Sequence, residues 1–456
     1  MINKSTVHVM AFATLLFCTQ ISIAQTTRHV SSTGNDNDND CLNSTTPCGS
    51  IQHALNVAAD NDIVSLASGA YAQSATLVIN RPLTLEAADP TNLPILSTTA
   101  DQLIRISSPN VPISGLHLQL GLTPTTGRTG IYSNSNFNEL SLQNNRFEST
   151  APRDIISFMN YEWNATAIQL EGALTSAHTV NIEGNEIMRV ANTKIFGRGL
   201  YMGNGAGTNC PGGIIANNTF EGFYGLQFVR ISEDLTITNN QIFGNTMFNS
   251  IIGEKAVIAE GNTFSAASAV GAAYHYSTIE FRSIKNGSIT FNNNSIQDYR
   301  NLGILSSASK AIFLKGNTFT PAVDATDFSS LFVNTKYMTS GTQNDNYSNE
   351  ISIKGNTFAA GTVNQGTAIF FGNHYTNVNP AFSNVIIGGP AESEKNTFAN
   401  SLGAYITLDA HSGASTSFPL WNTYAVTTMS PVNVNIEALA MNNNYNLSSR
   451  AAIEAK

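Results

Sequence analysis

Three observations predict an all-β solenoid, a parallel β-helix, for this chain of 456 residues. A short corner motif recurs along the sequence, several of its copies are spaced by about one solenoid turn, and the composition is rich in Asn, Ser, Thr and Gly with only 12 % charged residues. Low charge together with many β-branched and aromatic residues favours stacked strands over helices or disorder.

Each copy of the motif reads apolar, any, apolar, any, then Gly or Asn, then Asn, any, and Phe or Ile, as in residues 140–147 and 351–358. Apolar–polar alternation is typical of a strand with one buried face. The Gly/Asn–Asn pair indicates a tight turn, because these residues tolerate the left-handed backbone region. We expect the second Asn of successive corners to stack into a hydrogen-bonded ladder. The corner asparagines are Asn145, Asn185, Asn218, Asn240, Asn262, Asn294, Asn317 and Asn356, with a weaker copy at Asn396.

The spacing of these corners fits coils that pack only on their neighbours. Asn218, Asn240 and Asn262 are 22 residues apart, and Asn317 follows Asn294 by 23. Solenoid repeats recur at such periods. Longer separations elsewhere indicate either unrecognisable coils or loops inserted into one coil.

The start of the mature chain is typical of an end cap, which a solenoid needs because a bare terminal coil exposes its core and strand edges. Residues 52–59 predict a short helix with Ser50 as its N-cap and with Ile51, Leu55 and Ala58 on one face. We therefore predict an N-terminal cap region at 25–75 and the β-helix at 76–446. Residues 447–456 form either a C-terminal cap or the start of a missing segment.

Residues 1–24 are typical of a secretory signal peptide. Lys4 precedes an apolar stretch at 7–17, and small residues stand before a cut ahead of Gln25. The stretch is shorter than the roughly 20 residues that span a bilayer, and no later segment is expected to cross a membrane. Cys18 raises the alternative of a lipoprotein anchor, which Phe17 before it disfavours. The expected location is extracellular or on the cell surface, with the periplasm as an alternative.

Three cysteines remain after the signal peptide. Cys41 and Cys48 lie seven residues apart in a polar loop and are expected to form a local disulfide in an oxidising compartment. Cys210 is expected to be a buried free thiol rather than a nucleophile, because no base is visible beside it.

Charge and motifs exclude several classes of function. The net charge of −9 and the lack of a basic stretch argue against a nucleic-acid partner. No zinc-type spacing, nucleophile elbow or twelve-residue calcium loop occurs, so no metal site or cofactor is predicted. Calcium remains possible at the alternating Asn/Asp run 35–40, although such runs are more often solvated loops.

The opening of the mature chain resembles a known group of proteins. Arg28 to Asn35, Ser50 to Leu55, Asp62 to Leu66, Gly69-Ala70-Tyr71 and Pro82 to Leu85 are similar to the first coils of right-handed parallel β-helix repeat proteins of the pectin-lyase-like group, and the later Gly-Asn-Thr-Phe corners are similar to that group's repeats. The resemblance covers most of the mature chain and implies the right-handed fold. It leaves activity open, because the group includes lyases, hydrolases, epimerases, adhesins and passive stalks.

Two functions compete. The first is a non-catalytic, adhesin-like or glycan-contacting surface module, consistent with the low charge and the lack of a compact catalytic set. The second is a lyase that cleaves uronate-containing polysaccharide by β-elimination, with Lys255 as the base and Arg282 neutralising the carboxylate. Phe281-Arg282 resembles the arginine strand of alginate- and chondroitin-type lyases. The alternative for both cations is an exposed, solvated sheet face.

Two further possibilities are a glycosidase and a sugar-stacking groove. A hydrolase needs paired acids, whereas Asp298, Asp324 and Asp327 fall in turns or insertions. Aromatic residues in the long insertions are either platforms for sugar rings or small cores that hold the loops down. They are Tyr132, Phe137, Phe158, Tyr161, Trp163, Phe223 and Tyr224.

Overall fold

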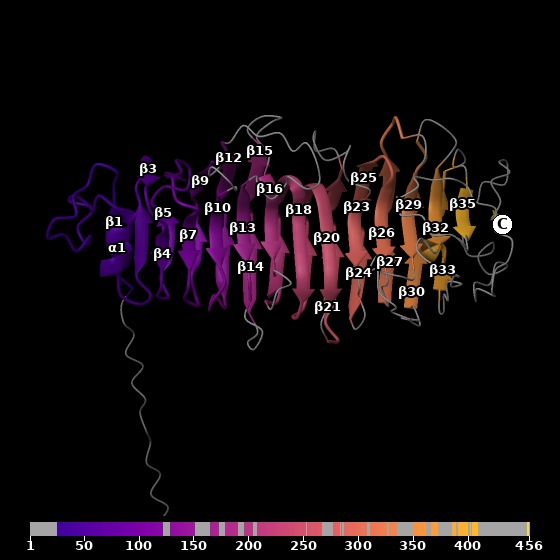
Figure 1. Ribbon diagram of the computed structural model, residues 1–456, viewed down its shortest axis with the longest axis horizontal. Helices are drawn as coiled ribbons and strands as arrows, with labels where there is room; N and C mark the ends of the chain where they lie inside the picture. The colour runs from indigo at the N-terminus through magenta and orange to yellow at the C-terminus, as the bar shows by residue number, and fades with distance from the viewer. Residues whose placement is uncertain are drawn as a thin grey trace, which may run out of the picture.

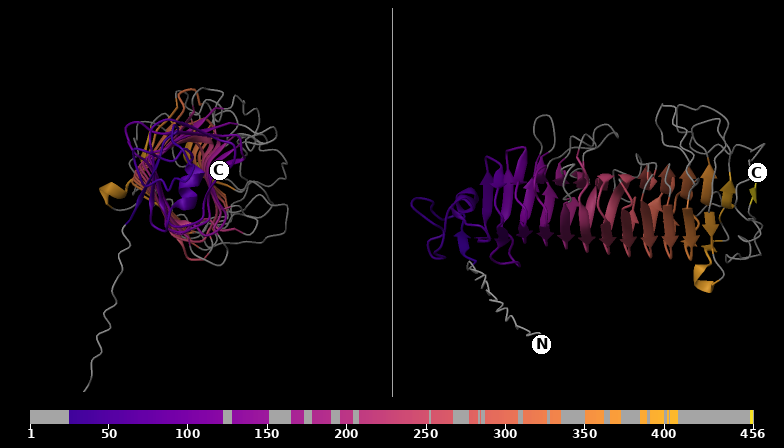
Figure 2. Two further views of the ribbon diagram at one scale, coloured as in Figure 1. Left: turned by 90° about the vertical axis from the view of Figure 1, so that its left-hand side faces the viewer. Right: turned by 90° about the horizontal axis from the view of Figure 1, so that it is seen from below.

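The computed structural model describes residues 25–408 and 454–455, with gaps at 122–127, 151–164, 173–177, 190–195, 204–207, 252, 267–276, 283, 285–286, 308–310, 326–327, 335–349, 362–365, 373–384, 389–390, 400–401 and 403. The strands stand side by side along one long axis in chain order (Figure 1). Seen along that axis, successive coils superimpose into one tube (Figure 2). The chain is a right-handed parallel β-helix, as predicted.

The first face of the tube is a 13-stranded sheet in which the paired strands run parallel. The strands alternate buried apolar residues with outward residues, most of which are polar, as the corner motif predicts. Its strands are β1 (Thr27–Val30), β2 (Ile63–Leu66), β5 (Thr84–Ala87), β8 (Pro112–Ser114), β11 (Leu140–Gln143), β14 (Thr179–Glu183), β17 (Gly212–Ala216), β19 (Leu235–Thr238), β21 (Ala256–Glu260), β24 (Ser288–Asn292), β27 (Ala311–Lys315), β30 (Glu350–Lys354) and β33 (Val385–Ile387).

The second face begins directly after the corner turn. It comprises β3 (Ala70–Gln73), β6 (Ile95–Thr98), β9 (His117–Leu120), β12 (Arg146–Ser149), β15 (Glu186–Arg189), the start of β18 (Thr219–Ile231), the start of β20 (Gln241–Ile251), β22 (Thr263–Ser265), β25 (Ser295–Tyr299), β28 (Thr318–Pro321), β31 (Thr357–Phe358) and β34 (Thr397–Phe398). A short 3₁₀ helix, η2 (Glu392–Glu394), precedes the last of these strands.

The third face completes each coil, and β18 and β20 are long enough to run through both the second and third faces. Its other strands are β4 (Leu77–Ile79), β7 (Gln102–Ile106), β10 (Thr129–Ser133), β13 (Thr166–Leu170), β16 (Phe196–Met202), β23 (Ser277–Arg282), β26 (Leu302–Ser307), β29 (Ser329–Asn334), β32 (Thr367–Gly372), β35 (Ala404–Leu408) and β36 (Glu454–Ala455).

Buried asparagines join the coils at the corner between the first and second faces. The Nδ2 of each donates to the Oδ1 of the next, from Asn145 to Asn185 at 3.0 Å and onward to Asn396. The same Oδ1 also accepts the preceding asparagine's backbone N–H, as in Asn218 to Asn240 at 2.9 Å. This is the predicted ladder, and it includes the weaker copy at Asn396.

The residue before each ladder position provides the turn. Asn144 has φ 52° and Gly184 has φ 66°, and the later corners repeat this left-handed conformation. An L residue with a branched side chain is strained there, so Gly and Asn are selected. The turn explains why each repeat has the same order, with the left-handed residue first and the buried ladder asparagine second.

The interior holds one apolar core along the tube. Phenylalanines that follow the corners stack on one another, as in Phe319 on Phe358 at a centroid distance of 4.9 Å and Phe358 on Phe398 at 5.2 Å. This stacking accounts for the Phe or Ile at the end of each motif, because equivalent positions on successive coils lie in contact.

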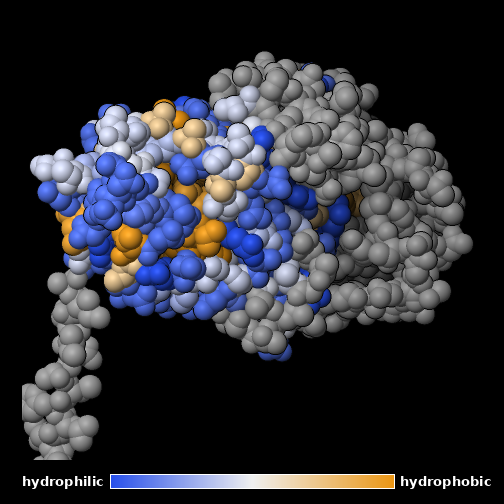
Figure 3. Space-filling model, turned by 60° about the vertical axis from the view of Figure 1, so that its left-hand side comes forward, coloured by the Kyte–Doolittle hydropathy of each residue, from blue (hydrophilic) through white to orange (hydrophobic). Residues whose placement is uncertain are grey.

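A short helix, α1 (Ile51–Val57), forms at the N-terminal end within the region predicted as helical. Ser50 Oγ accepts the His53 N–H, and Ile51, Ala54 and Leu55 are buried. The surface around this end is mainly hydrophilic and surrounds an apolar area (Figure 3). The parallel sheets already begin at Thr27, inside the segment predicted as cap.

The predicted Cys41–Cys48 disulfide is present, with a Cα–Cα distance of 5.1 Å, and Cys210 is a buried free thiol. The predicted signal peptide and most of the segment after Leu408 lie outside the described residues. In the part of the chain that the structure describes, no helix has the length and apolarity that a membrane span requires.

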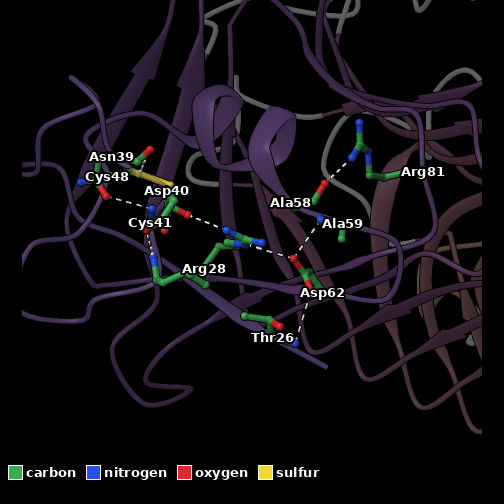
Figure 4. A network of polar contacts seen from close by, with 11 residues as sticks. Thr26, Arg28, Asn39, Asp40, Cys41, Cys48, Ala58, Ala59, Asp62 and Arg81 are labelled. Carbon is green, nitrogen blue, oxygen red and sulfur yellow. Dashed lines mark hydrogen bonds and ion pairs between the residues drawn. A yellow bond between two sulfur atoms is a disulfide. The ribbon is translucent and has the colours of Figure 1, made fainter. Parts of the chain in front are cut away.

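A polar network ties the first strand to the turn that follows α1 (Figure 4). Asp62 accepts hydrogen bonds from Arg28 Nε at 3.0 Å and from the Ala59 N–H at 2.8 Å, while Arg28 Nη1 donates to the Asp40 carbonyl at 2.7 Å. Burial by itself raises the pKa of Asp62, but the hydrogen bonds and the Arg28 charge outweigh it, so the pKa lies below its ordinary value.

We predict that Asn317→Ala lowers the free energy of unfolding by about 3 kcal/mol, because the buried N–H and Nδ2 groups of Asn294 lose their shared acceptor and Asn356 Oδ1 loses one of its two donors. Thr318→Ala, at the adjacent exposed position, is the matched control and should change the unfolding free energy little. Chemical denaturation measures both. Equal losses for the two variants would contradict a stabilising ladder.

We predict that Asp62→Asn costs about 2 kcal/mol of stability at neutral pH, because Arg28 then lacks its buried anion. A depressed carboxyl pKa contributes stability that is fully present above the ordinary pKa of 3.8 and is lost as the pH falls through the folded-state value. The difference between wild type and variant should therefore shrink on acidification, as thermal melts at a series of pH values would show. A difference independent of pH would contradict this assignment.

Candidate functional site

A continuous row of outward side chains runs along the third face, one from each coil. Strand pairing sets Arg105 beside Tyr132, Tyr132 beside Gln169, Gln169 beside Tyr201, and Tyr201 beside Gln227. Their chain neighbours, such as Ile131 and Ser133, point into the core. Because parallel strands are about 4.8 Å apart, the row places one functional group at each such step along the axis. We call these five residues the polar row.

The N-terminal half of the polar row is the part most open to solvent. Arg105 is exposed, and Tyr132 and Gln169 are partly exposed. Gln169 Nε2 donates to Glu171 Oε1 at 2.6 Å. Burial raises the pKa of Tyr132, and the nearby Glu171 charge raises it further while Arg105 opposes it. Tyr132 is therefore a neutral phenol at physiological pH, suited to hydrogen bonding and ring contact.

The next coils continue the polar row with a cation over an aromatic ring. The Arg198 guanidinium lies 4.3 Å from the centroid of Tyr201, and Arg198 Nε donates to Gln227 Oε1 at 2.8 Å. Tyr201 and Gln227 are only 7 % and 6 % exposed. The two contacts hold these side chains in fixed positions.

Beyond Gln227 the same row becomes mainly apolar. Met247, Leu305, Phe332 and Phe370 follow in register, with Glu280 between the first two. Phe332 and Phe370 stack with a centroid distance of 4.9 Å. The third face thus changes from polar to apolar near its middle.

Lys255, predicted as a lyase base, lies immediately before β21, beyond the corner that follows the third face. Its Nζ is 2.9 Å from Glu233 Oε2 on the previous coil. The hydrogen bond and the charge of Glu233 raise the pKa of Lys255. A raised pKa keeps the ammonium protonated at neutral pH, which is the wrong direction for a group that must accept a proton.

Arg282, predicted to neutralise a substrate carboxylate, ends β23 and forms an ion pair with Glu280. Ser277 Oγ also donates to Glu280 Oε1, at 3.0 Å. The register sets Arg282 beside Asn249 and Ser307, whereas Lys255 accepts a backbone hydrogen bond from Ser288, after the corner. The corner separates the two cations, and each has an acidic partner of its own.

An ion pair on the second face, between Arg189 and the buried Glu221, was not singled out by the sequence. Glu221 is buried beside Arg189, whose Nε lies 2.7 Å from Glu221 Oε1. Burial raises the pKa of Glu221 although Arg189 opposes that shift. Both residues lie just after a corner motif, Arg189 two residues after Ile187 and Glu221 directly after Phe220, but no sequence signal indicates that the two coils bring these opposite charges together.

Of the aromatic residues considered as sugar platforms, three of the four that the structure describes pack internally instead. Phe137 is buried and lies 4.6 Å, between ring centroids, from His178, while Phe223 and Tyr224 form a small buried cluster with Met247. Tyr132 is partly exposed and belongs to the polar row. Phe158, Tyr161 and Trp163 lie outside the described residues.

The Asn/Asp run at 35–40 uses its side chains on the surrounding backbone. Asp36 accepts from the Gly49 and Ser50 N–H groups and from Ser50 Oγ, and Asn39 Oδ1 accepts the Cys41 N–H. Among the described residues, the group of metal-ligand types whose ligand atoms gather within 4.8 Å is Cys41, Cys48 and His53, and the disulfide occupies both sulfurs.

Of the other acids considered for hydrolysis, Asp298 accepts a hydrogen bond from Ser265 Oγ at 2.6 Å and Asp324 forms an ion pair with Arg300. Asp327 lies outside the described residues. Each of the two described acids therefore has a local partner. Burial raises the pKa of the Cys210 thiol well above its ordinary value, which opposes a nucleophilic role.

Comparison with known proteins finds similarity in structure. The sequence matches no protein-family model and no curated protein. The A-module of mannuronan C-5 epimerase AlgE4 from Azotobacter vinelandii is 13% identical over 81% of this chain and 91% of its own, with a TM-score of 0.43. An alginate lyase from Paenibacillus sp. str. FPU-7 is 14% identical over 85% and 99%, with a TM-score of 0.35. The Dettilon tailspike protein is 13% identical over 78% and 63%, with a TM-score of 0.39. Likeness at this level concerns the fold alone.

Proposed function

We propose that this protein is a secreted or cell-surface β-helix that binds a polysaccharide or cell-surface glycan along its third face without cleaving it. The observation that supports this function is the polar row, which carries Arg105, Tyr132, Gln169, Tyr201 and Gln227 on five successive coils. The predicted signal peptide and the Cys41–Cys48 disulfide support an oxidising compartment outside the cytoplasm.

The chemistry of the polar row suits sugars. An aromatic ring offers its face to the apolar C–H face of a sugar, while guanidinium and amide groups hydrogen-bond to hydroxyls or carboxylates. The step of about 4.8 Å between coils is comparable to the length of one sugar ring, so a chain laid along the axis meets Arg105, Tyr132 and Gln169 at successive sugar residues. Arg105 and Arg198 favour acidic sugars over neutral ones.

A β-eliminating lyase is the second candidate, and the position of Arg282 favours it. Arg282 lies on the same face as the polar row, two residues beyond Glu280. The ion pairs of Lys255 with Glu233 and of Arg282 with Glu280 weigh against catalysis, because both cations already have partners. We therefore place the binding module first.

Binding is tested by affinity electrophoresis of the full-length protein in gels containing alginate, pectate or a glycosaminoglycan. We expect retardation by at least one acidic glycan and about tenfold weaker retardation for Tyr132→Ala and for Arg105→Ala, since each removes one contact from the exposed end of the row. Gln241→Ala, exposed on the second face, is the control. Equal retardation of all three variants would contradict the assignment to the third face.

Catalysis is tested by following the ultraviolet absorbance of unsaturated uronate products with the same glycans. We expect no increase for wild type. An increase that Lys255→Ala and Arg282→Lys both abolish would overturn the binding-module proposal in favour of the lyase. Arg282→Lys is preferred to Ala because it keeps a cation beside the buried Glu280.

A further inference from the structure

The outside of the first face carries a regular stripe that the proposed function does not use. In strand register, large apolar residues alternate with hydroxyl residues over seven consecutive coils. We call this set the outer stripe. It consists of Ile214, Thr236, Ile258, Thr290, Phe313, Ser352 and Ile386.

The apolar members of the outer stripe are unusually open to solvent. Ile214 is 50 %, Ile258 39 % and Ile386 52 % exposed. Neighbouring coils present hydroxyl residues at the same height, so the apolar side chains stand as separate knobs with shorter side chains between them. Exposed apolar residues in an ordered array indicate an interaction surface, whereas isolated ones do not.

Charged residues two positions along each strand flank the outer stripe, and their sign reverses along the axis. Glu183 and Glu260 lie toward the N-terminal end of one register row, and Lys315 and Lys354 lie toward its C-terminal end, where Lys354 also forms an ion pair with Glu394. A surface with opposite charges at its two ends is complementary to itself when turned end for end.

We propose that the outer stripe binds the same stripe of a second copy of this chain in an antiparallel, two-fold dimer. A two-fold axis parallel to the strands, passing between β24 and β27, sets Ile258 over the second copy's Ser352. The same operation sets Phe313 over Thr290 and Ile386 over Thr236. Three of the four large side chains then each meet a short one, whereas Ile214 lies beyond the overlap of the two stripes.

The same operation brings the flanking charges into opposition. It places Glu260 of each copy opposite Lys354 of the other, and Lys315 opposite Asn292. The row on the other side of the stripe consists of the small residues Ala256, Ser288 and Ala311, which allow close approach, and ends at Glu350. Both size and charge thus select one register of the two copies.

A glycan is a poorer occupant of this surface. A chain of uniform charge laid along the stripe would be attracted at one half and repelled at the other. Six of the seven strands overlap in this register and span about 25 Å, so three rows cover about 500 Å² per copy, which is the size of a weak, reversible protein interface. We therefore expect a dimer that forms and dissociates with concentration.

Sedimentation velocity of the full-length chain over a concentration series tests the dimer. We expect concentration-dependent dimers for wild type and monomers for Ile258→Arg. Met188→Arg, which replaces an exposed apolar residue of the second face, should dimerise as wild type does. Circular-dichroism melts establish that the variants fold. A monomeric wild type at every concentration, or a dimer unaffected by Ile258→Arg, would overturn the proposal.

Charge exchange tests the register. Glu260→Lys and Lys354→Glu should each weaken the dimer about tenfold, because like charges then face one another. The double variant should restore dimerisation, since each new lysine meets a new glutamate on the second copy. A double variant weaker than both single variants would contradict the antiparallel register. Glycan retardation by the third face should be unchanged in all these variants, so the two proposals fail independently.

Discussion

The hydrogen-bonded ladder of buried asparagines is the interaction on which the rest of this structure depends. Each ladder side chain accepts two hydrogen bonds from one neighbouring coil and donates to the other, so every coil must present the same atom at the same place. The separation in sequence does not matter. Asn218 reaches Asn240 after 22 residues at 2.9 Å, and Asn145 reaches Asn185 after 40 residues at 3.0 Å.

The geometry of that corner is the same in each ladder coil, so the differences in coil length fall in other parts of the coil. In the coil that begins at Asn240, β20 runs through the second and third faces without a break. In longer coils the additional residues fall between the second and third faces, as at 151–164 and 267–276, or after the third face, as at 335–349 and 373–384. The first face stays regular along its length. This regularity aligns the residues of the outer stripe in a straight row. The outward side chains of the third face are chemically more diverse.

The corner and its ladder could be predicted because their chemistry is local. A left-handed residue, an asparagine and a large apolar residue occupy adjacent positions, and each has a reason to be there. The polar row could not be predicted in the same way. Tyr201 lies 16 residues after Asn185, whereas Gln227 lies nine residues after Asn218. Only the strand pairing shows that the two are neighbours. Lys255 and Arg282 illustrate the same limit. Their separation in sequence is close to the length of one coil, but it does not show that a corner of the tube lies between them.

Hydrogen–deuterium exchange with resolution at single residues tests the ladder most directly. The backbone N–H groups of Asn185, Asn218, Asn240 and Asn262 lie at turns, yet each donates to the side chain of the next coil's asparagine. The ladder predicts that these amides exchange as slowly as those of the adjoining strands, and that Asn317→Ala accelerates exchange at Asn294, whose N–H donates to the lost side chain. Exchange of these amides at the rate of exposed turns in the wild-type protein would contradict the account.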